Sequence, residues 1–136
     1  MKINELVVGD YVMCQSIKGK YARITEIYLT LDEKPKRMVA LNAHDARYCV
    51  PIESIEPIPL KRIHLTKNGF RATNAEDTEF AYRDGYEVKV MIDTDIVDAI
   101  FLSIEFAERN MWKEIKYVHE LQQAMRIMEC DKEIKL

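Results

Sequence analysis

Two stretches of strict two-residue alternation are followed, near the end of the chain, by a stretch with helical periodicity. Apolar side chains occupy every second position from Tyr86 to Ile92 and again from Ile100 to Phe106. A period of two places such side chains on one face of a β-strand. Between Val118 and Met128 the apolar residues instead recur at helical spacing, at Val118, Leu121, Met125 and Met128. The pattern predicts paired strands covered on one face by an amphipathic helix.

The second half of the chain also contains signals for a shorter helix and for the turns. Leu60 to Lys67 has a short helical pattern, and Asn68-Gly69 fits a C-terminal cap because glycine tolerates positive φ. Asp84-Gly85 predicts a hairpin turn before the first alternating strand, and a second turn is expected at residues 93–95. Residues 60–136 are therefore predicted to form an α-β-β-β-α lobe, whose last six residues are a short edge strand or a frayed end.

The first half of the chain is predicted to form short strands without helices between them. Runs rich in β-branched and aromatic residues are separated by polar turns, at residues 11–15, 21–29, 38–41 and 48–51. Pro51, Pro57 and Pro59 then favour a single helical turn or kink, followed by an edge segment. We expect residues 1–59 to form a small antiparallel SH3-like β-barrel, which makes the whole chain α+β.

Composition sets limits on the class of partner. The 136 residues are 48% hydrophobic and 32% charged, as in a folded domain, and the net charge is −3. Residues 1–60 contain 8 basic and 8 acidic side chains, whereas residues 61–136 contain 12 and 15. Non-specific nucleic-acid binding needs a basic face, so the overall charge argues against it, although a local patch remains compatible with it.

The cysteines and the N-terminus indicate the compartment. The chain has three cysteines, an odd number, and they lie far apart, at Cys14, Cys49 and Cys130. This is typical of proteins in a reducing compartment. The N-terminus has no apolar signal region, and no apolar run reaches the length of a bilayer span. We therefore expect a cytoplasmic protein with no membrane partner. The sequence also has no nucleotide fingerprint or paired catalytic carboxylates, and no cofactor is expected.

Four strings in order mark a family resemblance that spans nearly the whole chain. They are Leu6 to Val12, Ile55 to Leu60, Leu65 with Gly69-Phe70, and the most specific one, Tyr117-Val118-His119-Glu120-Leu121-Gln122. In these strings the chain resembles a family of small uncharacterised bacterial proteins that are often encoded in phage-derived or mobile DNA. The resemblance implies a two-lobe α+β architecture and no established activity.

The chain departs from this family pattern at two positions. Lys61 stands where threonine is more usual, and a lysine side chain cannot cap the helix that follows. The start of that helix is therefore in question. Glu120 stands where glutamine is expected.

Two histidines are candidates for a metal or hydrolase site. His119 lies in the predicted C-terminal helix, but the fourth residue after it is Gln123, so the two-histidine zinc motif is absent. His44 lies in a polar loop, and it is a conceivable partner of Cys49 in a nucleophile pair, although Cys49 falls in a strand and would need an activating electropositive site. The simpler interpretation of His119 is a core histidine that donates to a backbone carbonyl. No metal ligands are assigned.

Two further groups of residues are candidates for binding. Basic and aromatic side chains of the first lobe form the only plausible nucleic-acid surface, with Lys34, Lys36, Arg37, Arg47, Tyr21, Tyr28 and Tyr48. These residues equally fit a charged loop above half-buried tyrosines. Trp112 is a candidate anchor for a partner, because tryptophan is enriched at binding hot spots, and it equally fits the base of the core.

The sequence favours a non-enzymatic interaction module, associated with phage or mobile elements, whose partner is another protein or a second copy of the chain. A nucleic-acid-binding protein that uses the basic and tyrosine-bearing face is the alternative. A small hydrolase or metal protein built around His119 or His44 is the second alternative.

Overall fold

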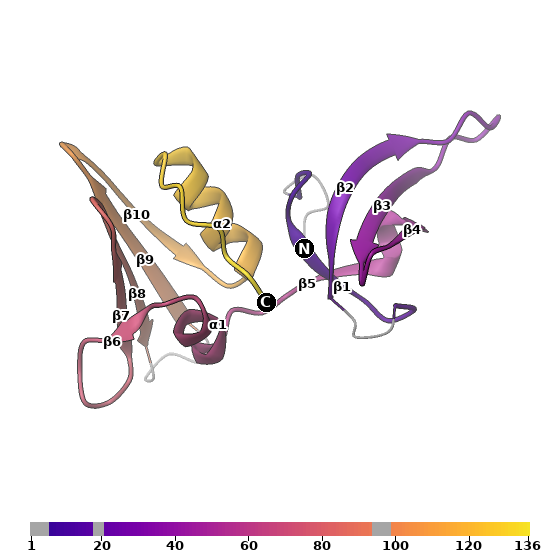
Figure 1. The fold of residues 1–136 in the computed structure, drawn as a ribbon. Coiled ribbons are helices and arrows are strands. Elements are labelled where there is room, and N and C mark those ends of the chain that lie inside the picture. Colours follow the sequence, from indigo (N-terminus) through magenta and orange to yellow (C-terminus); the bar gives the residue numbers. More distant parts are fainter. Residues whose placement is uncertain (1–5, 18–20, 94–98) are drawn as a thin grey trace. The chain divides into compact units, whose positions relative to one another are not determined.

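The structure is a computed structural model, and it describes residues 6–17, 21–93 and 99–136 (Figure 1). The chain divides into two compact units, Met1–Ile58 and Pro59–Leu136. We call them the N-terminal unit and the C-terminal unit and describe each by itself. Both units are built on antiparallel sheets, and the C-terminal unit adds two short helices, so the predicted α+β class is confirmed.

The N-terminal unit contains one five-stranded antiparallel sheet in the order β4-β3-β2-β1-β5. Its elements are β1 (Tyr11–Cys14), β2 (Tyr21–Leu29), β3 (Arg37–Ala43), β4 (Ala46–Pro51), the 3-10 helix η2 (Ile52–Ser54) and β5 (Ile55–Pro57). The predicted strands and the single turn after Pro51 are therefore confirmed. The core lies on one face of this sheet, where side chains such as Val12, Ile24, Val39 and Leu41 are fully buried.

Two tight turns position the strands of this unit. Gly9 has φ +97° and the amide of Asp10 donates to the carbonyl of Val7, which makes the predicted turn. His44 and Asp45 have φ of 51° and 62° and form the two-residue loop between β3 and β4. Positive φ at both central residues is the type I′ geometry, which matches the twist of a hairpin.

The predicted closure of the first lobe into a barrel is not observed. β5 returns to pair with β1, so the sheet is a meander whose last strand lies beside its first. Its two edges are β4 and β5, and no pairing joins them in the part of the chain that the structure describes. Within the described residues, the sheet is an open antiparallel meander.

The C-terminal unit contains a second five-stranded antiparallel sheet, in the order β10-β9-β8-β7-β6. Its strands are β6 (Arg71–Ala72), β7 (Glu79–Arg83), β8 (Glu87–Asp93), β9 (Ala99–Phe106) and β10 (Arg109–Ile115). The helices are α1 (Arg62–Lys67) and α2 (Val118–Ile127). The three central strands, both helices and the Asp84-Gly85 turn follow the prediction, whereas most of the turn expected at residues 93–95 lies outside the described residues.

The prediction of only three strands in this unit was wrong, because β6 and β10 add an edge on each side. β6 has two residues, too few to show a period. β10 has exposed side chains on both faces, including Asn110 and Lys113, so its sequence lacks the apolar alternation of a half-buried strand. Edge strands often contain charged residues, which oppose edge-to-edge pairing with the strands of other molecules.

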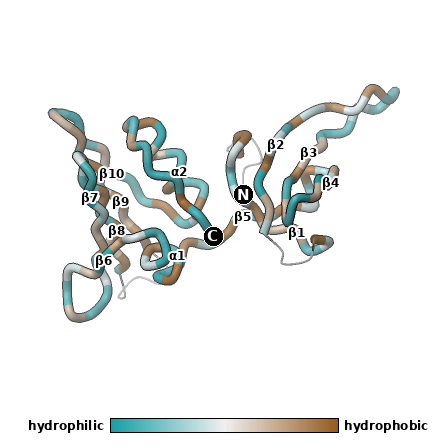
Figure 2. Tube along the Cα trace, viewed as in Figure 1, coloured by the Kyte–Doolittle hydropathy of each residue, from teal (hydrophilic) through white to brown (hydrophobic). Residues whose placement is uncertain are grey.

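The helix α2 covers one face of this second sheet (Figure 1). Val88, Val90, Leu102 and Ile104 are completely buried on that face, and the helix buries its own apolar stripe, including Leu121 and Met125. The alternation of hydrophobic and hydrophilic residues along the strands can be followed in Figure 2. The predicted role of the helical stripe, to cover the sheet, is therefore confirmed.

Both helices begin with a cap supplied by their third residue. In α1 the Nδ1 atom of His64 accepts a hydrogen bond from the backbone N–H of Lys61, at 2.9 Å. In α2 the Oε1 atom of Glu120 accepts from the N–H groups of Lys116 and Tyr117, at 3.0 and 3.1 Å. Helix α1 therefore starts at Arg62 although Lys61 offers no side-chain acceptor, because the imidazole of His64 at the third helical position makes the other bond of a capping box, to the backbone N–H of Lys61.

The last residues of the chain form neither an edge strand nor a frayed end. Residues 129–136 have no regular secondary structure, yet Ile134 is only 1% exposed. The side-chain amides of Asn68 and Gln122 hold this segment through hydrogen bonds to its backbone. Polar side chains thus make the bonds that the prediction assigned to a neighbouring strand.

Candidate interaction surface on the C-terminal sheet

The face of the second sheet opposite α2 carries a pair of stacked aromatic rings. Phe101 on β9 and Trp112 on β10 have centroids 5.1 Å apart and an interplanar angle of 18°. Met91 on β8 lies directly across from Phe101 in the strand register. Together they form an apolar centre on this face, which we call the aromatic patch.

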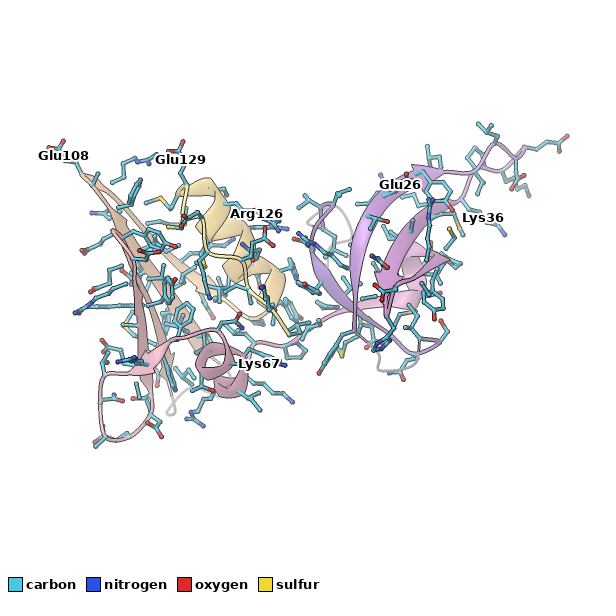
Figure 3. The ribbon with its side chains drawn as sticks, in the orientation of Figure 1. Glu26, Lys36, Lys67, Glu108, Arg126 and Glu129 are labelled. Carbon is cyan, nitrogen blue, oxygen red and sulfur yellow. The ribbon has the colours of Figure 1, made fainter. Side chains whose placement is uncertain are left out.

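The aromatic patch is exposed, in contrast to the face beneath α2. Trp112 is 65% exposed, whereas Phe101 and Met91 are half-buried by their neighbours in the sheet. The covering helix α2 lies on the other side of the sheet, and side chains stand out from the open face (Figure 1, Figure 3). Trp112 therefore does not close the core, which was one of the two places predicted for it.

Charged side chains surround the aromatic patch, and most of them are acidic. Glu87 forms ion pairs with Arg83 and, at 3.2 Å, with Lys89. Burial raises the pKa of Glu87, but hydrogen bonds from Lys89 and Arg83 outweigh it, so the pKa of this carboxyl is lowered overall. In the described strands, the register places on this face the carboxylates of Glu79, Glu87, Asp93, Glu105 and Glu114, and the cations of Arg71, Arg83 and Lys89.

The edge strand β10 offers backbone groups beside the aromatic patch. Phe106 pairs with Arg109 across a two-residue turn, so this closing pair exchanges both of its hydrogen bonds within the hairpin. Along β10 the bonding alternates, and Asn110, Trp112 and Glu114 consequently direct their N–H and C=O groups away from β9. The residues with outward backbone groups are therefore the same ones whose side chains lie on the open face.

The structure divides the predicted nucleic-acid residues between the two faces of the first sheet. Tyr21, Tyr28 and Arg47 lie on the face opposite the core, together with Tyr11 and Arg23. The guanidinium of Arg23 lies 5.8 Å from the centroid of the Tyr11 ring. This outer face thus brings together three of the seven predicted residues.

The remaining predicted residues lie elsewhere. Tyr48 packs against the core, and Arg37 is on that same side of β3. Lys34 lies in the loop between β2 and β3, and Lys36 lies beside it, on the hairpin that also carries Glu26 (Figure 3). The seven residues therefore do not form one continuous surface.

Two contacts modify the chemistry of the outer face of the first sheet. Arg47 forms a 2.9 Å ion pair with Glu26, which offsets its charge. A hydrogen bond with Cys49 raises the pKa of the Tyr28 phenol above its ordinary value. The outer face is therefore aromatic and only weakly basic.

The two candidate histidines occupy different environments. His119 is 1% exposed and stacks on the Tyr117 ring, with centroids 5.6 Å apart. His44 lies in the hairpin turn, and Cys49 lies on β4 about 10 Å along the strand from Ala46. The fold does not bring His44 and Cys49 together. Among the described residues, no group of three or more His, Cys, Asp or Glu side chains is arranged to hold a metal ion.

Comparison with protein-family models, curated proteins and solved structures finds no match to this chain. In the described part of the chain, no helix has both the length and the apolar character needed to cross a membrane. Inferences about function therefore rest on the arrangement of the side chains described above.

Sequence reasoning identified Trp112 but missed Phe101. Both residues are large aromatics on the face of the sheet that is otherwise polar. Phe101 lies on this face because its neighbours Ile100 and Leu102 direct their side chains to the core. An aromatic residue out of phase with a clear alternation is the signal that was available. The sequence did not predict that β9 pairs with β10, because β10 itself shows no apolar alternation.

Proposed function

We propose that the protein is a non-enzymatic interaction module that binds a protein partner through the aromatic patch of its C-terminal unit. The observation that carries this proposal is the stack of Phe101 with the 65% exposed Trp112 on an otherwise polar sheet face. Large exposed aromatics that are already held in place lose little conformational entropy on binding.

The physical properties of the patch support binding to a protein. Tryptophan contributes strongly at interface centres, where it becomes desolvated within a ring of polar contacts. Here the ring consists of charged side chains such as Glu87 and Lys89, which already pair with one another. A rigid apolar centre with a polar rim is the usual anatomy of a protein interface.

The test compares two exposed apolar side chains of similar exposure. Proteins retained from a cell extract by the wild-type chain are compared with those retained by Trp112→Ala and by the control Ile127→Ala, whose residue is 68% exposed. We expect that at least one protein is retained by the wild-type chain and by the Ile127→Ala control but is not retained by Trp112→Ala. Trp112 is the only tryptophan, so that protein should shift its fluorescence to the blue and protect it from acrylamide. Equal retention by all three chains, with unchanged fluorescence, argues against the proposal.

We also infer that the N-terminal unit is a variant of the SH3-like barrel and that the protein acts in the cytoplasm. The four-strand meander, the 3-10 turn η2 and the return of β5 to β1 support the first inference. Thiols buried without disulfides at Cys14 and Cys130 support the second. Association with phage or mobile elements stays a prediction from the family resemblance.

A second candidate function is binding of single-stranded nucleic acid by the outer face of the first sheet. The observation that favours it is the shared placement of Tyr11, Tyr21 and Tyr28 with Arg23 and Arg47. Aromatic rings can stack on bases, and arginines can follow the phosphates. A shift assay at low salt tests it: binding should weaken with salt and fall in Tyr21→Ala, and no binding at micromolar protein removes this function.

A further inference from the structure

We propose that β10 binds its partner by strand addition, taking an extended segment in which cationic side chains alternate with uncharged ones. This inference rests on the proposed function, and it names the chemistry and the backbone geometry of the partner. Among the described residues, β10 is an edge of the sheet and pairs only with β9. Such an edge offers a row of donors and acceptors to an incoming strand.

The backbone of β10 supplies the first part of the argument. The Phe106–Arg109 closing pair directs the N–H and C=O groups of Asn110, Trp112 and Glu114 outward. An added strand that pairs with these groups places every second side chain on the open face, next to Trp112. Strand addition and the aromatic patch therefore involve the same three residues.

The charges on the open face determine which side chains fit there. Five carboxylates and three cations lie on this face in the described strands, at Glu79, Glu87, Asp93, Glu105, Glu114, Arg71, Arg83 and Lys89. Glu114 lies on β10 itself, two residues from Trp112. An arginine or lysine beside these residues can pair with the carboxylate and stack on the indole ring.

The other face of β10 favours uncharged side chains on an added strand. Arg109 and Lys113 lie on the side of the sheet that faces α2, with Met111 between them. Arg109 pairs with Glu129 at 3.3 Å, in the segment that follows α2, and Figure 3 shows Glu129 and Glu108 at the same end of this unit. Cations of an added strand on this side would meet like charges, so these positions require apolar or neutral residues.

A second copy of the chain is a poorer occupant than a cationic segment. Residues 61–136 have 15 acidic and 12 basic side chains, so two such units repel each other. Antiparallel pairing of β10 with its own copy would join two acidic faces. Charge complementarity favours a separate, basic partner.

The experiment uses the full chain and three peptides of about nine residues, long enough to cover β10. The first alternates arginine and valine, the second has the same composition in two blocks, and the third alternates glutamate and valine. Binding is followed by anisotropy of labelled peptides and by Trp112 fluorescence. We expect the alternating arginine peptide to bind at least about tenfold more tightly than either of the others, with an affinity that falls as salt increases.

Two variants separate the backbone contribution from that of the side chain. Asn110→Pro removes a backbone donor that points away from β9, so no bond to β9 is lost. Proline is tolerated at such positions of an edge strand. Asn110→Pro should weaken binding about tenfold, as should Trp112→Ala, whereas Ile127→Ala should bind like the wild type. In the wild-type chain, the amides of Asn110, Trp112 and Glu114 should exchange more slowly with peptide bound, which tests strand addition even where the proline variant does not fold.

The results that would contradict strand addition can be distinguished from those that would contradict the proposed function. Equal binding of the block and alternating peptides, or unchanged exchange at the three amides, overturns strand addition. If Trp112→Ala still loses the captured protein, the interaction surface stands and only the mode of binding is wrong. If none of the three peptides binds, a cationic strand is not the partner, whatever the capture experiment shows.

Discussion

The side chain of Asn68 pairs with the backbone of Lys135 as a neighbouring strand would. Its Nδ2 donates to the Lys135 carbonyl at 2.7 Å and its Oδ1 accepts from the Lys135 N–H at 2.7 Å. Gln122 repeats the arrangement nearby: its Oε1 accepts from the N–H of Ile134 and its Nε2 donates to the carbonyl of Lys132. Two buried amides thus fix the end of the chain against α1 and α2.

Loss of the Asn68 amide should destabilise the protein. Asn68→Ala leaves backbone groups of Lys135 without partners in a part-buried site, and should lower the free energy of unfolding by about 1–3 kcal/mol. Asn68→Asp should cost at least as much, because its carboxylate would face the carbonyl oxygens of His64 and Lys135. Urea unfolding measures both.

The exposed Asn110→Ala serves as the control for these variants and should change stability little. A chain that lacks residues 132–136 completes a double-mutant cycle. Asn68→Ala should cost less in that shortened chain, since its partner is already gone. Fully additive effects would show that Asn68 does not act through the C-terminal segment.

The cap of α1 should make stability depend on pH. Burial lowers the pKa of His64, and the charges of Lys61 and Lys67 lower it further. The neutral ring is the form that accepts the N–H of Lys61, so this contribution is complete above the unfolded-state pKa of about 6.5. As the pH falls below that value towards the lowered folded-state pKa, the contribution is lost.

Thermal unfolding followed from pH 8 to pH 5 measures this dependence. His64→Gln retains a side-chain oxygen at the third helical position and has no titrating group, so its curve should be flatter than that of the wild type. His44→Gln, in the exposed β3–β4 turn, should keep the wild-type slope. Identical slopes in wild type and His64→Gln would contradict the cap.

The cap of α2 should depend on an acceptor oxygen rather than on charge alone. Glu120→Ala removes the acceptor for the N–H groups of Lys116 and Tyr117 and should lower the free energy of unfolding by about 1 kcal/mol. Glu120→Gln keeps a carbonyl oxygen and should lose only part of this. Chemical unfolding of the two variants gives the comparison; equal losses would mean that charge near the helix terminus, not the hydrogen bonds, stabilises α2.

Relief of the left-handed backbone at the β3–β4 turn should stabilise the N-terminal unit. Asp45 has φ of 62°, and glycine is preferred at this second position of a type I′ turn. Asp45→Gly should raise the free energy of unfolding by about 0.5–1 kcal/mol. Ala46→Gly, one residue later in β4, should instead lower it by about 0.5–1 kcal/mol. A loss of stability in both variants would count against the assigned turn type.

The elements that sequence reasoning identified are those whose signals are local. The alternation along β8 and β9 and the stripe of α2 arise because the same residues that determine periodicity also face the core. The loop at His44-Asp45 lies between two short strands, so its place followed from those strands. The Gly9 and Asp84-Gly85 turns need backbone conformations that few residues adopt, and composition alone reveals them.

The elements that sequence reasoning missed depend on partners far along the chain. β10 has no apolar period, and it is a strand because β9 provides one side of its hydrogen bonding. Its Trp112 became part of a surface only through the stack with Phe101. The capping role of His64 was hidden as well, because an imidazole acceptor at that position is not part of the usual capping pattern.

The sequence by itself determined the α+β class, the order of most elements and the faces that become buried, because these follow from side-chain period and from turn chemistry between neighbouring residues. Only the tertiary structure decided how the chain end is held and which side chains meet on the open face. Asn68 and Lys135 are 67 residues apart in the sequence, yet they form two hydrogen bonds of 2.7 Å. Such contacts come from packing in three dimensions, and no local pattern encodes them.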